Sequence, residues 1–327
     1  YFLNSLSFIK KILRTLFLKL LWKKNGDFLK IMIKFSNFVR FNKSVRLGIL
    51  LFIGIVIVLI VIVFVDLFDK SLRVSFYDIG QGDAVFIETP ENYQILIDGG
   101  PGPLILRKLG RDMVFWDKTI DLVIATHPDA DHISGLIDVL ERYNVKNILI
   151  SPSLDKDTEV FKVFYKAIWN EGAMLYLAEA GQSFSGILTK SKSNEQSENY
   201  IDFQVLYPFN FTNNIYTEDF NDMSIVNLLE YKGQKILFTA DATIKVENML
   251  LEKYPSLDIN ILKAGHHGSK TSSSFNFLKA ITTDLAIIQV GLDNRYKHPH
   301  QSVIERFQNL GIPIWRTDLD GDLRLQF

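Results

Sequence analysis

The sequence has 327 residues, of which 47% are hydrophobic and 22% are charged, so it is long enough to bury a sizeable core. The absence of cysteine excludes disulfide bonds and thiolate metal ligands. Residues 1–46 hold eleven of the 36 basic residues and one of the 37 acidic residues, which leaves 25 basic and 36 acidic residues in 47–327. The resulting net charge near −11 opposes an extended basic groove for nucleic acid.

Residues 1–46 are predicted to form a basic segment in the cytoplasm or at a membrane interface. Within 8–20, apolar residues fall on one helical face and basic residues on another: Ile9, Ile12, Leu13, Leu16 and Leu20 against Lys10, Lys11 and Arg14. This pattern favours an interfacial amphipathic helix. A remnant of a membrane region with no role of its own is an equal alternative.

Residues 47–68 are predicted to form a single transmembrane helix. Leu47–Val65 contains nineteen residues without a charge, and at ~1.5 Å per residue this run approaches the ~30 Å hydrocarbon core. A buried core helix is the alternative. Because the basic segment precedes the run and Asp66 and Asp69 follow it, the N-terminus is expected in the cytoplasm and the remainder outside the membrane.

Residues 72–327 are predicted to form one α/β domain with two similar halves. In the first half, apolar or alternating runs predict strands at 73–77, 84–89, 94–97, 122–126 and 147–150, with helices near 134–143 and 158–171. In the second half, strands are predicted near 201–207, 224–231, 234–239, 259–263 and 284–290, with helices near 243–254, 273–281 and 301–310. This order is compatible with two sheets packed face to face under outer helices. Residues 189–200 are polar and aperiodic and predict an exposed loop.

The segment His-Pro-Asp-Ala-Asp-His at 127–132 predicts a metal site. Four coordinating side chains follow a strand-like run within six positions: His127, Asp129, Asp131 and His132. Imidazole and carboxylate groups suit Zn²⁺ or Mn²⁺. All six histidines occur in three pairs, of which the others are His266/His267 and His298/His300, whereas packing residues would be scattered. The alternative, a polar turn that caps a helix, would use one carboxylate and neither histidine.

Five further segments accompany this loop: Val74–Ala84, Ile95–Gly100, Phe238–Asp241, Leu262–Ser269 and Asn294–Pro299. Together they resemble the metallo-β-lactamase superfamily, whose loop is commonly His-x-His-x-Asp-His. The replacement of the second histidine by Asp129 resembles the hydrolase domain of the ComEC family of DNA-internalisation competence proteins, and the match extends from about Leu72 to Phe327. The resemblance implies a four-layer αββα sandwich with an active site at one rim.

The resemblance also implies two divalent metal ions, with Asp241 as the bridging ligand. The first ion would be held by His127 and Asp129, and the second by Asp131, His132 and His266. Adjacent side chains on extended backbone point apart, so only one of His266 and His267 is expected to be a direct ligand. His266 is preferred, and His267 is then expected to contact substrate or another ligand.

Four residues are expected in catalytic or supporting roles: Asp98, Asp131, His267 and His298. Asp98 ends a strand and would orient a ligand by hydrogen bonding. His298, together with Lys270 or Arg295, would stabilise negative charge that develops on a phosphodiester.

The loop Asn221–Ser224 lacks the histidine that many members of the superfamily carry before the strand of the bridging aspartate. Asn221 or Asp222 could substitute, and oxygen ligands favour a harder ion such as Mn²⁺. Zn²⁺ stays open as the metal because three of the expected ligands are histidines.

These features predict a membrane-anchored, dinuclear metal-dependent hydrolase, a phosphodiesterase or nuclease that acts on DNA outside the membrane during uptake. The expected partners are the membrane, DNA or another phosphodiester, and a membrane channel or other competence proteins. Two alternatives stay open. The acidic charge favours a hydrolase of cell-envelope phosphoesters, and the missing loop histidine favours a non-catalytic binding module with a degenerate site.

Overall fold

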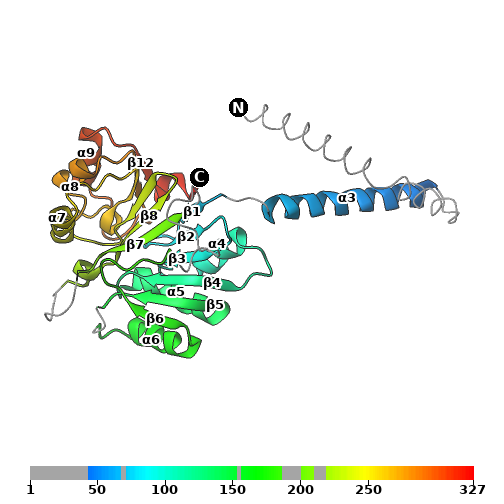
Figure 1. Ribbon diagram of the computed structural model, residues 1–327, viewed down its shortest axis with the longest axis horizontal. Helices are drawn as coiled ribbons and strands as arrows, with labels where there is room; N and C mark the ends of the chain where they lie inside the picture. The colour runs from blue at the N-terminus through cyan, green and yellow to red at the C-terminus, as the bar shows by residue number, and fades with distance from the viewer. Residues whose placement is uncertain (1–42, 68–70, 153–155, 186–199, 210–218) are drawn as a thin grey trace. The chain divides into compact units, whose positions relative to one another are not determined.

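The computed structural model describes residues 43–67, 71–152, 156–185, 200–209 and 219–327 (Figure 1). The chain divides into two units, residues 1–69 and 70–327. In the first unit, helix α3 spans Lys43–Leu67, and the structure describes side chains of this helix only as far as Val58. No helix in the described part of the chain is long and apolar enough to cross a membrane. The predicted interfacial helix at 8–20 and nearly all of the predicted loop at 189–200 lie outside the described residues.

The second unit contains a seven-stranded sheet, ordered β13-β1-β2-β3-β4-β5-β6 (Figure 1). Strands β1 to β6 come first in the chain, and β13 is its last strand. Its strands are β1 Arg73–Phe76, β2 Val85–Glu88, β3 Gln94–Ile97, β4 Thr119–Ala125, β5 Asn144–Ile150, β6 Met174–Leu177 and β13 Leu323–Gln326. The helices of this half are α4 Leu104–Asp112, α5 Ala130–Arg142 and α6 Glu159–Glu171. Strands β3 to β6 pair in parallel, so their carboxyl ends meet at one edge of the sheet.

The later part of the chain forms a six-stranded sheet, ordered β12-β11-β10-β9-β8-β7. Its strands are β7 Ile201–Tyr207, β8 Val226–Tyr231, β9 Gln234–Phe238, β10 Ile261–Lys263, β11 Leu285–Ile288 and β12 Ile314–Arg316. The helices are α7 Ile244–Lys253, α8 Phe275–Ile281, α9 Gln301–Asn309 and α10 Thr317–Asp320, with short 3₁₀ turns η1 Phe220–Met223 and η2 Gly265–Gly268. Strands β9 to β12 are parallel.

Three hydrophobic clusters arrange these elements in four layers. The first cluster lies between the sheets, where the Phe76 ring on β1 stacks on the Phe238 ring on β9 at a centroid separation of 5.9 Å. The second joins α4, α5 and α6 to the first sheet, and the third joins α7, α8 and α9 to the second sheet. The two helix groups therefore lie on opposite outer faces (Figure 1). The predicted α/β fold, with two facing sheets under outer helices, is confirmed.

Strand β4 fixes the position of the predicted metal-binding loop. Its residues from Ile120 to Ala125 are all buried. A continuous buried run of this kind is typical of a parallel strand that is covered on both faces, and each buried Leu, Ile or Val contributes ~1.5–3 kcal/mol of transfer free energy. The chain leaves this rigid strand two residues before His127.

Helix α5 packs closely on the turn that follows β3. A Cβ atom placed on Gly135 would lie only 2.0 Å from the carbonyl oxygen of Gly99. Two backbone hydrogen bonds join the same segments, because Gly99 N–H donates to the carbonyl of His132 and Gly135 N–H donates to the carbonyl of Gly100. The first turn of α5 is therefore held against the end of β3.

Candidate metal centre

The segment 127–132 is part loop and part helix. Helix α5 begins at Ala130, upstream of the predicted start near Ser134, because Asp129 takes the extended backbone of a helix N-cap. Asp131 and His132 consequently lie in the first turn of α5, and His127 lies in the preceding loop. Asp131 is the acidic residue in that turn, where the helix macrodipole favours negative charge.

Asp98 holds the ring of His132 from behind. Its Oδ2 atom accepts a hydrogen bond from His132 Nδ1 at 2.8 Å and from Thr126 Oγ1 at 2.6 Å, and its Oδ1 atom accepts from Thr126 N–H at 2.9 Å. All three residues are buried. With Nδ1 engaged, the His132 ring presents Nε2 to the interior of the site, as an imidazole ligand oriented by a carboxylate does.

Asp241 lies at the centre of the histidines. It follows β9 in a tight turn, and its N–H donates to Ser224 Oγ at 3.2 Å. Its Oδ1 atom is 3.5 Å from His132 Nε2, and its Oδ2 atom is 3.4 Å from His267 Nε2 and 3.8 Å from His127 Nε2. Thr243, not Asp241, occupies the N-cap position of α7. Asp241 therefore has both carboxylate oxygens turned to the site.

The adjacent residues His266 and His267 do not lie on extended backbone as predicted. Both have left-handed backbone, with φ of 47° and 51°, inside the turn η2. His267 is buried, and its Nδ1 atom lies 2.9 Å from the carbonyl oxygen of Gln289, which leaves Nε2 facing Asp131 Oδ2 at 3.5 Å. His266 is one quarter exposed and lies at the margin, with its Nε2 atom 3.6 Å from Asp241. His267 therefore occupies the interior of the cluster, whereas His266, the predicted ligand, lies at its margin.

Two residues without an expected ligand role also border the cluster. Lys263, on β10, is buried and forms an ion pair with Asp83. Its ammonium group also donates to the carbonyl of Ala240 at 2.9 Å and lies 3.9 Å from Asp241 Oδ1. A lysine at the end of an apolar strand, directly before Ala-Gly-His-His, is the signal that could have indicated this pair, because a buried lysine requires an acidic partner.

The glycine-rich turn after β1 packs against the backbone of Asp131 at the edge of the candidate site. Gly82 has a φ of 139°, and a Cβ atom there would lie 2.1 Å from the carbonyl oxygen of Asp131. Only glycine allows such a close backbone approach in this conformation. The turn thereby places Asp83 next to the histidines, within 3.3 Å of His267 Nδ1.

Several atoms at the centre that could bind a metal have no hydrogen-bond partner among the described residues. These buried atoms are His127 Nε2, His132 Nε2, His267 Nε2, Asp83 Oδ1 and Asp241 Oδ1. Buried polar atoms are ordinarily paired, and ligand atoms that share one tetrahedral zinc lie ~3.4 Å apart, as follows from ~2.1 Å bonds. In the described part of the chain, four groups of side chains have ligand atoms within 4.8 Å of one another, and two of them, called the donor groups below, are His127, His132 and Asp241, and Asp131, His132 and His267. The residues present therefore fit a metal centre.

The buried carboxylates of the cluster favour positive charge on the neighbouring histidines. Burial opposes a charged ring at His132, but the carboxylates of Asp241 and Asp98 outweigh it and raise the pKa of His132 well above its usual value. Burial likewise opposes a charged ring at His267, but the carboxylates of Asp241 and Asp83 outweigh it and raise the pKa of His267 to about 10. Burial and the charge on His132 lower the pKa of His127 to about 3. Protons on two histidines thus balance the carboxylates, and metal ions that bind there would replace those protons.

Other predicted site residues lie at the edge of the cluster or outside it. Asp129 forms an ion pair with Lys156 and belongs to neither donor group. Asp222 accepts hydrogen bonds from Thr243 and Lys245. His298 contacts the His266 ring edge-on at 5.6 Å, and burial followed by the charges of His266 and His267 lowers its pKa to about 4.

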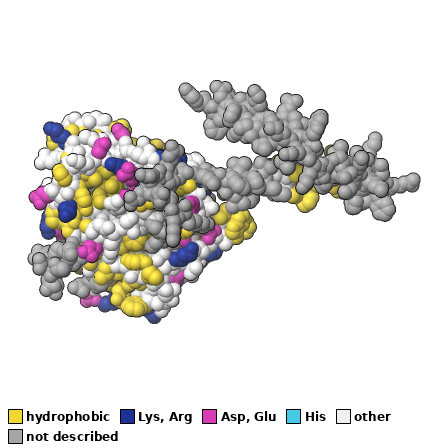
Figure 2. All heavy atoms as spheres, viewed as in Figure 1, with side chains coloured by type: hydrophobic (Ala, Val, Ile, Leu, Met, Phe, Trp, Pro, Cys, Tyr) yellow, Lys and Arg dark blue, Asp and Glu magenta, His cyan; other side chains and the backbone are white. Residues whose placement is uncertain are grey.

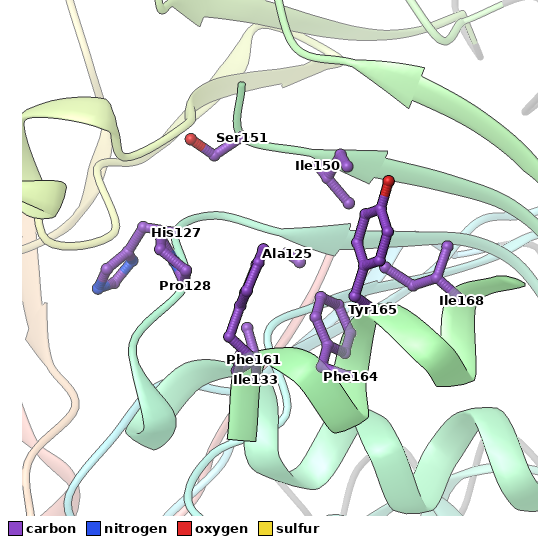
Figure 3. Close-up of a pocket in the computed structure, with 10 residues that line it drawn as sticks. All are labelled: Ala125, His127, Pro128, Ile133, Ile150, Ser151, Phe161, Phe164, Tyr165 and Ile168. Atoms are coloured by element: carbon purple, nitrogen blue, oxygen red, sulfur yellow. The ribbon is translucent and has the colours of Figure 1, made fainter. Parts of the chain in front are cut away.

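An apolar wall backs the site on the side of His127. Figure 3 shows His127 and Pro128 in the loop after β4, Ser151 beyond the end of β5, and aromatic rings from α6 packed beside Ala125 and Ile150. The space between them is about 10 Å³, room for about one water molecule. The wall therefore shields the back of the cluster from solvent.

A family model described as "Metallo-beta-lactamase superfamily" matches residues 77–291. The chain is 29% identical to ComE operon protein 3 of Bacillus subtilis, over 78% of this chain and 33% of that protein. It is 31% identical to Competence protein ComA of Neisseria gonorrhoeae, over 78% of this chain and 32% of that protein. It is 30% identical to Recombination protein 2 of Haemophilus influenzae, over 82% of this chain and 30% of that protein. The chain spans about a third of the length of these relatives.

Among solved structures, a mutant of CmlA beta-hydroxylase matches with a TM-score of 0.50 and 14% identity, over 79% of this chain and 54% of that chain. This likeness concerns the fold alone. The family match covers most of the described second unit, including every donor of the two groups above. The chain therefore belongs to the metallo-beta-lactamase superfamily.

Proposed function

We propose that this chain is a membrane-anchored, metal-dependent phosphodiesterase that cleaves DNA outside the membrane during its uptake. The observation that carries the proposal is the set of buried, unpartnered imidazole and carboxylate atoms around Asp241. The competence proteins to which the chain is similar support DNA as the substrate class.

The proposed ligands come from both halves of the fold. His127 and His132 with Asp241 would hold one divalent ion, and Asp131 with His132 or His267 would hold the other. Asp241 also lies 3.4 Å from His267 Nε2, which fits the bridging role expected for it. Three imidazoles together with carboxylates suit either Zn²⁺ or Mn²⁺. When bound, such ions supply Lewis-acid polarisation of a phosphate oxygen and activation of water.

Other side chains would support the reaction without holding metal. Asp98 fixes the orientation of His132 through the 2.8 Å contact. His298, with a pKa near 4, is neutral at pH 7 and has an N–H group to offer to a phosphate or leaving-group oxygen. Its buried Nδ1 atom has no partner among the described residues.

The membrane anchor is proposed from the sequence. The uncharged run Leu47–Val65, the basic residues before it and the acidic residues after it favour one span with the hydrolase unit outside. A membrane channel or other competence proteins are proposed as partners because the chain is similar to competence proteins.

The proposal is tested by metal content and cleavage on the full chain in detergent. Wild type is expected to hold about two Mn²⁺ or Zn²⁺ by elemental analysis and to cleave single-stranded DNA. Asp241→Asn is expected to lose metal and activity. His300→Asn is the matched control, because His300 caps α9 outside the donor groups and asparagine is also an N-cap residue.

Three results would overturn the proposal. DNA cleavage that persists at the wild-type rate in Asp241→Asn would show that another centre or a contaminant is responsible. Cleavage confined to bis(p-nitrophenyl) phosphate would favour the hydrolase of small envelope phosphoesters, which the net charge near −11 of residues 47–327 also favours. Absence of both metal and cleavage would favour the binding module.

A further inference from the structure

A pocket of about 700 Å³ lies directly beside the candidate metal centre. Asp131 belongs to both, since it lines the pocket and its Oδ2 atom faces His267 at 3.5 Å. The opposite walls come from the segment at the start of α6, including Lys156, and from the loop after β11, including Arg295 and Tyr296. A volume of this size is typical of a small-ligand site, and an occupant would reach the metal centre.

The loop after β11 presents a cation and an aromatic ring together. The Arg295 guanidinium lies 4.7 Å from the centroid of the Tyr296 ring and donates to its hydroxyl. Both side chains are exposed, and Arg295 forms no ion pair within the described residues. Because the guanidinium lies over the Tyr296 ring and the His298 ring also stacks on that ring, the outer face of the guanidinium, backed by the phenol ring, is the platform on which an unstacked base can lie, with a charge available for its phosphate.

Asn294 holds this platform in place. Its side-chain amide donates to the carbonyls of Gly291 and His298, and its Oδ1 atom accepts from His298 N–H at 2.9 Å. The loop is therefore ordered before a ligand arrives, which lowers the entropic cost of binding.

A row of rings connects the platform to the metal centre. The Tyr296 ring stacks on the His298 ring at a centroid separation of 5.7 Å, and His298 meets the His266 ring at 5.6 Å. His266 in turn lies 3.6 Å from Asp241. These short steps place the platform within reach of a nucleotide next to a phosphate that metal ions at the centre would hold.

The charges around the pocket fit a single phosphate-bearing strand and not a broad polyanion surface. Among the described lining residues, Asp129 pairs with Lys156 and Asp131 of α5 faces His267, so Arg295 supplies a positive charge without an ion pair, together with the N-terminal end of α6. Figure 2 shows one face of the molecule, on which basic and acidic side chains are scattered among hydrophobic ones.

We propose that this pocket binds one unpaired nucleotide of a single-stranded nucleic acid, with the base stacked on the platform of Arg295 and Tyr296. The proposal deepens the phosphodiesterase function and rests on it for the role of the neighbouring phosphate. Base pairing in a duplex would withhold the base from the platform, so the pocket selects single strands.

The test measures strand binding by fluorescence anisotropy, using the full chain in detergent with EDTA so that no cleavage occurs. The probes are a fluorescein-labelled oligothymidylate and an abasic strand of equal length, which has the same phosphates without bases. Wild type is expected to bind the oligothymidylate more tightly than the abasic strand. Tyr296→Leu is expected to weaken oligothymidylate binding by about 5- to 100-fold, the range for loss of one stacked base, and to change abasic-strand binding less.

Two variants serve as controls. Tyr296→Phe keeps the ring and is expected to retain the preference for bases. Phe115→Leu removes another exposed aromatic ring, which does not line the pocket, and is expected to bind both strands as wild type does. Equal affinity of wild type for the two strands would assign the pocket to a phosphate polymer without bases and overturn the proposal, as would unchanged binding in Tyr296→Leu or no strand binding at all.

Addition of Mn²⁺ to the same samples separates this proposal from the phosphodiesterase function. Strand cleavage by wild type with no effect of Tyr296→Leu on binding would reject the nucleotide pocket and leave the hydrolase intact. Binding that depends on Tyr296 without any cleavage would support the pocket and reject the hydrolase.

Discussion

Lys263 and Asp83 form an ion pair beneath the histidine cluster, and their side chains are only 2% and 4% exposed. Removal of the ammonium group would leave the buried carboxylate of Asp83 without its ion-pair partner. We therefore expect Lys263→Met to lower the free energy of unfolding by about 3–5 kcal/mol, measured by urea denaturation with EDTA present.

The double variant Lys263→Met/Asp83→Asn removes both charges of the pair. Because an uncharged amide is less costly to bury than an unpaired carboxylate, we expect it to be more stable than Lys263→Met alone. Additive losses in the two single variants would contradict this coupling.

The geometry at η2 predicts different effects for the two adjacent histidines. Glycine suits both positions because both have positive φ, so His266→Gly and His267→Gly differ only in the ring that is lost. His267→Gly is expected to lose about one bound metal per chain by elemental analysis, since the His267 ring lies inside the donor groups. His266→Gly is expected to keep both. The reverse result would restore the order expected from the sequence.

Asp322 predicts a defined acid dependence of stability. Burial opposes its charge, but hydrogen bonds from Lys108, Asp78 N–H and Arg111 prevail and lower the pKa of Asp322 below its usual 3.8. A carboxyl with a lowered pKa stabilises the folded state above pH 3.8, and this contribution is lost as the pH falls below that value.

The variant Asp322→Asn should therefore be less stable than wild type by about 1–2 kcal/mol at pH 7, with a difference that shrinks below pH 3.8. Thermal unfolding between pH 2.5 and 7 measures it. Asp157→Asn, at an exposed ion pair, is the control and should show no measurable change. A constant difference across this range would refute the assignment.

Gly135 and Gly110 provide a matched pair of helical glycines. Gly135→Ala would force a Cβ atom against Gly99, so we expect a loss of about 1–3 kcal/mol. Gly110 in α4 has open space around it, and Gly110→Ala should stabilise the protein by about 0.5–1 kcal/mol. Chemical denaturation of both variants checks this, and similar effects of the same sign would contradict the close approach of α5.

Sequence patterns predicted the strands with strong apolar runs and the helices with clear periodicity. The observed β3 and β7 have the predicted bounds 94–97 and 201–207. Helix α4 and strands β6, β12 and β13 were not predicted. Strand β13 contains only four residues and is defined by pairing with β1 at the other end of the unit, which no local pattern encodes.

The sequence identified the side chains at the candidate site better than their arrangement. His127, Asp131, His132, Asp241 and Asp98 lie together, as their positions after strands predicted. The position of Asp129 depends on its ion pair with Lys156, and that of His267 depends on the left-handed turn at η2. Neither feature produces a periodic pattern in the sequence. Their ligand roles stay predictions until metal is measured.

The donor groups join residues from the two halves of the chain, and this has a consequence for biosynthesis. More than one hundred residues separate His132 from Asp241 and His267. At about 5–20 residues per second, a ribosome needs on the order of 5–20 seconds to produce them. During that time the nascent chain carries only an incomplete set of ligands. Tight metal capture would therefore be a late event that follows docking of the second sheet, and metal occupancy in a cell would report how many molecules have completed their fold.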